Sequence, residues 1–147
     1  MTRNPLMKLT AALLFCLTLS GCPQKQTVAP PPPPPAEPSA EEKAAMAREA
    51  AGRRHVELGV AHFEAGNYPE AEHMLLTPEV WQVGVAQQLR ALKFLAFTYC
   101  VSERPLQCSQ SFERAFQLDP NFDLEPAERG HPLWGRAFSA VQSAQAR

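Results

Sequence analysis

Residues 92–120 read LKFLAFTYCVSERPLQCSQSFERAFQLDP, and this stretch decides the predicted fold. Apolar residues recur three and four positions apart on both sides of the turn at residues 102–107, and the alternation typical of strands is missing. Asp119-Pro120 is expected to end the second helix, because a residue before proline disfavours the helical region. Alanine, glutamate, leucine and glutamine dominate the chain after residue 40, so we expect one all-α domain over residues 41–147.

The same pattern occurs once more, 37 residues earlier in the chain. The earlier unit holds His55, Leu58, Gly59, His62, Ala71 and Leu75, and the later one holds Leu92, Leu95, Ala96, Tyr99, Cys108 and Phe112, followed by Ala115 and Pro120. The two units resemble the tetratricopeptide repeat. The resemblance implies a short helical solenoid of about two repeats, in which Gly59 and Ala96 let the paired helices approach closely. A generic antiparallel helical bundle is the alternative.

Turn residues predict where the helices begin and end. Gly66 can close one helix in the left-handed conformation, and Pro69 suits the first turn of the next. Thr77-Pro78 is expected to cut that second helix short.

A final helix is expected to start at His131-Pro132, after a loop over residues 121–130. Leu133, Ala137 and Val141 would share one face of it, with Trp134 and Phe138 beside them. We interpret this helix as the cap that covers the exposed end of a solenoid, and Trp134 as a buried packing residue.

The N-terminus has the features of a bacterial lipoprotein signal. Arg3 and Lys8 precede an apolar run at residues 9–19, and Leu19-Ser20-Gly21-Cys22 forms a lipobox. We expect residues 1–21 to be the signal peptide, cleaved before a diacylated Cys22. The run of about eleven apolar residues is shorter than the roughly 20 that span a bilayer, which disfavours an uncleaved membrane helix. Met7 is an alternative start, because a signal beginning there is complete.

Residues 22–40 are expected to tether the domain to the membrane. They contain six consecutive prolines, Pro30 to Pro35, which favour an extended polyproline II form with a reach of roughly 50 Å. Pro23 follows the lipidated cysteine, so the aspartate that signals inner-membrane retention is missing. We therefore expect the inner leaflet of the outer membrane, with the domain facing the periplasm. The inner membrane is the alternative location.

Two cysteines remain after Cys16 is lost with the signal and Cys22 is lipidated. Cys100 and Cys108 form an even pair in an oxidising compartment, at positions that an antiparallel helix pair brings together. We predict a structural disulfide between them. A redox function is disfavoured, because Cys-x-x-Cys is missing.

The sequence gives no sign of catalysis, of a cofactor or of nucleic-acid binding. Lys and Arg number 14 and Asp and Glu 15, without a basic block. Nucleophile elbows, phosphate-binding loops and HExxH are missing. His55, His62 and His73 could form a three-histidine metal site, but the repeat pattern already explains two of them as packing residues. We therefore expect neither an enzyme, a metal site nor a small-molecule substrate.

Surface binding remains as the expected function. In a stack of helix pairs, the first helix of each pair contributes to a concave face. The residues expected to line this groove are Arg53, Val56, Val60, Phe63, Arg90, Lys93 and Phe97. Their mix of apolar and basic groups suits an acidic or amphipathic segment of a partner protein. Alternatively, Phe63 and Phe97 belong to the core.

The stretch from Ala91 to Phe138 is similar to a known family. Its features are KFLAF-x-YC from Lys93, Cys108, Phe112-x-x-Ala115, DP-x-F-x-L from Asp119, and PAE-x-GHP-x-WG from Pro126. In these it resembles the TssQ-type lipoproteins associated with type VI secretion. The resemblance covers about a third of the chain and implies an accessory role near the secretion apparatus, without catalytic residues.

These features lead to two hypotheses. The first is a lipid-anchored periplasmic adaptor that binds envelope proteins, as an accessory component of a type VI secretion system. The second is a general envelope lipoprotein that bridges outer membrane and peptidoglycan or helps outer-membrane protein assembly.

Overall fold

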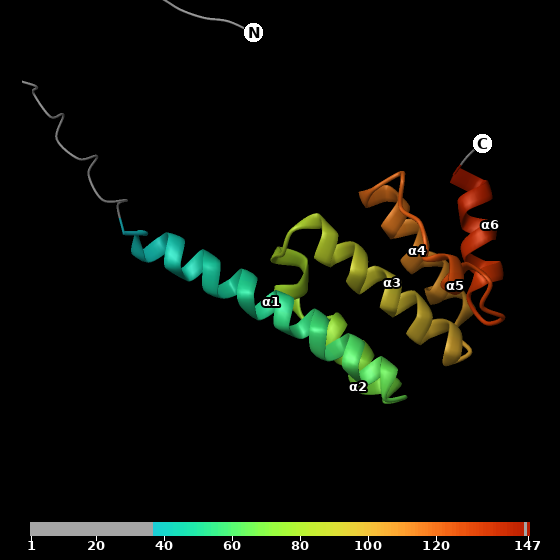
Figure 1. The fold of residues 1–147 in the computed structure, drawn as a ribbon, viewed down its shortest axis with the longest axis horizontal. Coiled ribbons are helices and arrows are strands. Elements are labelled where there is room, and N and C mark those ends of the chain that lie inside the picture. The colour runs from blue at the N-terminus through green and yellow to red at the C-terminus, as the bar shows by residue number, and fades with distance from the viewer. Residues whose placement is uncertain (1–36, 146) are drawn as a thin grey trace, which may run out of the picture. The chain divides into compact units, whose positions relative to one another are not determined.

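Every regular element among the described residues is helical. The computed structural model describes residues 37–145 and residue 147, and no strand occurs in them. Along the chain lie α1 (Ala40–Glu64), α2 (Tyr68–Leu75), the 3-10 helix η1 (Pro78–Gln82), α3 (Val85–Val101), α4 (Pro105–Leu118), α5 (Pro126–Arg129) and α6 (Gly135–Gln145) (Figure 1). The all-α prediction is confirmed. The expected signal peptide, Cys22 and the six-proline run lie outside the described residues. None of the helices in the described part is long and apolar enough to cross a membrane.

Helix α1 has a well-defined beginning. The Ser39 hydroxyl accepts the backbone N–H of Glu42 at 3.2 Å, and the Glu42 carboxylate accepts the backbone N–H of Ser39 at 2.6 Å. This capping box satisfies two N–H groups that have no partner inside the helix. Hydrogen bonding of the Glu42 carboxylate to the Ser39 backbone, and then to the Ser39 side chain, lowers the pKa of Glu42. The helix therefore starts at Ala40, one residue before the expected domain boundary, and residues 40–50 are exposed throughout.

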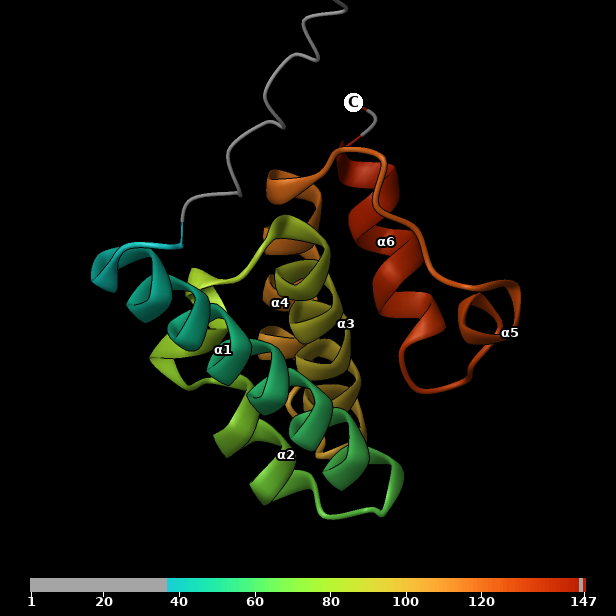
Figure 2. The ribbon, with the colours of Figure 1, turned by 60° about the vertical axis from the view of Figure 1, so that its left-hand side comes forward.

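The first four helices form two antiparallel pairs. In the first, Gly59 of α1 lies against Leu75 at the end of α2, and Gly52, earlier in α1, lies against Glu79 of η1. In the second, α3 and α4 are joined through Cys100 and Cys108 across their short turn. Helix α3 also packs on α1 and α2, and α4 packs on α6 (Figure 2). The first pair departs from the second at three matched positions of α1. Leu58 is 38 % exposed and His55 and His62 are half-buried, whereas their counterparts Leu95, Leu92 and Tyr99 are buried.

The helix ends predicted from turn residues are confirmed, but the predicted start of the last helix is not. Gly66 has φ of 78°, α2 ends before Thr77-Pro78, and α4 ends before Asp119, as expected. The predicted start of the last helix at His131-Pro132 is wrong, because α6 begins at Gly135. Residues 131–134 form a turn instead, in which the backbone N–H of Gly135 bonds to the carbonyl of His131. Leu133 consequently lies outside the helix and is 54 % exposed, contrary to the expected apolar face.

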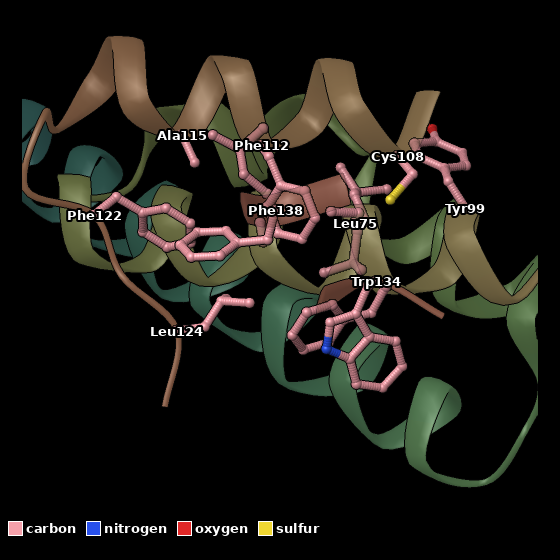
Figure 3. Close-up of a cluster of buried hydrophobic side chains, with 14 of the residues drawn as sticks. Leu75, Tyr99, Cys108, Phe112, Ala115, Phe122, Leu124, Trp134 and Phe138 are labelled. Atoms are coloured by element: carbon pink, nitrogen blue, oxygen red, sulfur yellow. The ribbon is translucent and has the colours of Figure 1, made fainter. Parts of the chain in front are cut away.

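The C-terminal half of the core is built from aromatic rings. Phe138 of α6 lies 5.3 Å from Phe112, 5.6 Å from Phe116 and 6.1 Å from Phe122, measured between ring centroids. Figure 3 shows the rings of Phe112, Phe122 and Phe138 lying close together in this cluster. Phe122 comes from the segment between α4 and α5, so this segment, together with α6, closes the end of the second helix pair.

Gly52 is a close-contact position that the sequence did not reveal. A methyl group added there would collide with the backbone carbonyl of Glu79 and with the side chain of Val83. We expect Gly52→Ala to lower the free energy of unfolding by about 2 kcal/mol, because overpacking costs roughly 1–3 kcal/mol and outweighs the gain in helix propensity. Urea unfolding measures the change. Gly130→Ala is the control, because nothing lies within 4 Å of the added methyl. Equal stability of both variants would contradict the close approach of η1 to α1.

Candidate protein-interaction surface

The structure separates the residues of the expected groove into buried and exposed groups. Val56, Val60 and Phe97 are 0 %, 4 % and 2 % exposed, so the prediction that they line an open surface is wrong. Phe63 is partly buried against the core. The alternative interpretation, that Phe63 and Phe97 are core residues, fits the structure.

The chain's own C-terminal segment covers this face. The indole ring of Trp134 stacks on the ring of Phe97, with centroids 4.1 Å apart and planes inclined by 22°. The same indole lies 6.3 Å from the ring of Phe63, which belongs to α1. Trp134 thereby bridges the first helices of the two pairs and is itself 8 % exposed, which confirms its predicted packing role.

The basic residue at the centre of the expected groove is already paired within the chain. The ammonium group of Lys93 lies 2.8 Å from the carboxylate of Glu128, and the two side chains are 19 % and 21 % exposed. The indole N–H of Trp134 donates to the backbone carbonyl of Glu128 at 2.9 Å, so the same residue anchors both contacts. A partner's carboxylate would have to displace Glu128 to reach Lys93.

Packing accounts for three residues of the Gly-His-Pro-x-Trp-Gly motif, His131, Trp134 and Gly135. The His131 ring stacks on Trp134 with centroids 3.3 Å apart. A side chain at Gly135 would collide with the backbone carbonyl of Arg129, so only glycine fits at the start of α6. These contacts hold residues 128–135 in the shape that lays Trp134 on Phe97.

Arg53 and Arg90 are the members of the expected groove that remain at the surface. Arg53 pairs with Glu49 at 2.6 Å, one helical turn away, and both side chains are nearly half exposed. Arg90 is exposed, and no ion pair to it occurs within the part of the chain that the structure describes. The predicted groove is therefore reduced to an exposed edge that includes Arg90.

The predicted disulfide between Cys100 and Cys108 is confirmed. The bond joins the end of α3 to the start of α4, with Cα atoms 5.2 Å apart and Cys108 fully buried. Arg104, in the turn between these helices, pairs with Glu72 of α2 at 2.6 Å and lies 4.5 Å above the ring of Tyr99. Burial, and then the neighbouring Glu72, raise the pKa of Tyr99. The disulfide thus fixes the turn that ties the second helix pair to α2.

The histidines take structural positions. The Nδ1 atom of His55 lies 2.9 Å from the hydroxyl of Thr77 and 3.9 Å from the carboxylate of Glu79, which connects α1 to the segment after α2. No group of three or more His, Cys, Asp or Glu side chains suited to a metal ion gathers in residues 37–145. His55, His62 and His73 are therefore not brought together as a metal site.

Comparisons of the chain with protein-family models, with curated proteins and with solved structures found no match in any of the three.

Proposed function

We propose that this chain is a lipid-anchored periplasmic adaptor, which binds envelope proteins through a tetratricopeptide-like helical domain and serves as an accessory component of a type VI secretion system. The observation that carries the proposal is the burial of matching positions on the second helix of each pair. Ala71 and Cys108 are fully buried, as are Leu75 and Phe112. Stacked helix pairs of this kind present extended surfaces to other proteins.

The cysteines support the proposed location. The lipobox ends at Cys22, and the Cys100–Cys108 bond is of the kind that persists outside the reducing cytoplasm. Lipidation by two or more acyl chains gives stable anchoring, because one chain binds a bilayer only marginally. The proposed role in type VI secretion depends on the resemblance of the stretch from Ala91 to Phe138 to the TssQ-type lipoproteins.

Replacing Cys22 tests the anchor. We expect Cys22→Ser to abolish lipid attachment and processing, and the protein to stop co-fractionating with the outer membrane. Membrane flotation and mass spectrometry of the expressed protein measure both effects. Cys16→Ser is the matched control, because that cysteine lies within the expected signal and leaves the lipobox intact. Unchanged fractionation and processing of the Cys22 variant would refute the anchor.

The adaptor role is tested by cross-linking in cells and purification of the membrane-bound chain. We expect secretion-system membrane components to co-purify, and Arg90→Glu, at the exposed edge of the expected groove, to reduce their recovery. Arg136→Glu, on α6, is the control for a charge change elsewhere. Lys93 is unsuitable for this test because its reversal would break the ion pair with Glu128. Cosedimentation with purified cell wall, without other proteins, would instead favour the general envelope role.

A further inference from the structure

A groove lies along α4, on the side of α3 away from Trp134. It consists of two hollows that share Arg114 as a lining residue. One, of about 240 Å³, is bordered by Trp81, Leu92 and Leu118, and the other, of about 120 Å³, by Leu76, Leu95 and Tyr99. Leu92, Leu95 and Tyr99 follow one another at helical spacing and form the floor. This surface was not anticipated from the sequence.

The short second helix accounts for this opening. Helix α2 has 8 residues, whereas α4 has 14. After Thr77-Pro78 the chain turns into the short 3-10 helix η1, so the flank of α4 beyond Leu76 faces the side chain of Trp81 instead of a further turn of α2. Two apolar side chains consequently stay at the surface along the groove, Leu76 at 44 % and Leu118 at 36 % exposure.

Arg114 is the one charged side chain lining the two hollows. Its guanidinium group lies 4.9 Å above the ring of Trp81. Within residues 37–145, no carboxylate forms an ion pair with it. A guanidinium over an indole ring is attracted to the ring face, and it still has N–H groups that a carboxylate can accept in pairs. A partner that complements this groove therefore carries a negative charge at the point where the two hollows meet.

The wall formed by α4 suits a polypeptide backbone. Gln107, Gln110, Arg114 and Gln117 succeed one another three or four residues apart on one face of the helix and extend over about 15 Å. Amide side chains offer both donors and acceptors, which can pair with the N–H and C=O groups of an extended chain. In such a chain, alternate side chains point to the same face, and five residues extend over about 13 Å between the first and last.

We propose that this groove binds an extended peptide segment of a partner protein with the pattern apolar-x-acidic-x-apolar. The acidic side chain pairs with Arg114, and the apolar side chains two positions before and after it enter the two hollows. This inference rests on the proposed role of the domain in protein binding, and it names the partner's chemistry at a surface separate from Arg90.

The test uses the mature lipidated protein in a neutral detergent and a fluorescein-labelled, end-capped peptide, Leu-Ser-Glu-Ser-Leu. Fluorescence anisotropy is expected to show saturable binding. Replacing the glutamate of the peptide by glutamine, or Arg114→Gln in the protein, is expected to weaken binding by about tenfold or more, as loss of a charged hydrogen bond does. Arg136→Gln is the control and is expected to leave binding unchanged. Arg114 is exposed, so its variant keeps the fold, which far-UV circular dichroism verifies.

Three results would overturn the inference: an anisotropy that does not saturate as the protein is titrated into the labelled peptide, equal binding of the glutamine peptide, or equal weakening by Arg114→Gln and Arg136→Gln. If the peptide fails while envelope proteins still co-purify with the wild-type chain, this groove is refuted and the adaptor role stands. If the peptide binds but no envelope protein is recovered in cells, the adaptor role is refuted instead.

Discussion

Phe97→Ala is expected to lower the free energy of unfolding by about 3–5 kcal/mol, the cost of deleting a buried aromatic side chain. Phe97 is 2 % exposed and touches rings from three other parts of the fold: Phe63 in α1, Phe112 in α4 and Trp134 before α6. Its removal leaves a cavity where these parts meet. Small domains have a total stability of only about 5–15 kcal/mol, so the variant approaches the limit of folding. Urea unfolding followed by circular dichroism measures the loss.

A double-mutant cycle tests the contact that covers the expected groove. Phe97→Leu and Trp134→Leu, made singly and together, keep apolar groups in place and avoid complete unfolding. We expect a coupling energy of about 1 kcal/mol or more, because stacked rings in direct contact are not independent. Leu106→Ala, at 66 % exposure, is the control and should change stability by less than about 0.5 kcal/mol. A coupling near zero would contradict the placement of the C-terminal segment on α3.

Removing the disulfide is expected to produce the second large effect. Cys100→Ala combined with Cys108→Ala should lower the free energy of unfolding by about 2–4 kcal/mol, because the cross-link closes a short loop and restricts the unfolded chain. Because reducing conditions keep the two thiols apart, the domain is expected to reach its full stability only in an oxidising environment.

Reduction of the wild-type protein distinguishes the contribution of the cross-link to stability from that of side-chain packing at the two cysteines. Unfolding in excess dithiothreitol should show the same loss as the double variant, apart from the small change in side-chain volume at Cys108. Mass spectrometry of the exported, unreduced protein should find a mass two daltons below that of the dithiol form. Free thiols at both positions after export would contradict the prediction.

The local features of this chain were predictable from the sequence. The left-handed turn at Gly66, the early end of α2 before Thr77-Pro78 and the joining of Cys100 to Cys108 all depend on residues within a few positions of one another. Backbone sterics allow few conformations at Gly66 and before Pro78, and the short turn between α3 and α4 brings the two cysteines together. The late start of α6 escaped prediction because it depends on Gly135 packing against Arg129.

What the sequence determined by itself is the helical composition and the turns at Gly66 and Thr77-Pro78, because periodicity and chain sterics act over short distances. Only the tertiary structure decided what covers each face. The helical spacing of Val56 and Phe97 in the sequence is the same whether a groove is open or covered. Trp134 and Glu128 cover α3 through contacts with Phe97 and Lys93, which lie more than thirty residues earlier in the chain. The shortness of α2 was visible in the sequence, but the groove that it leaves beside Arg114 required the positions of η1, α3 and α4 together.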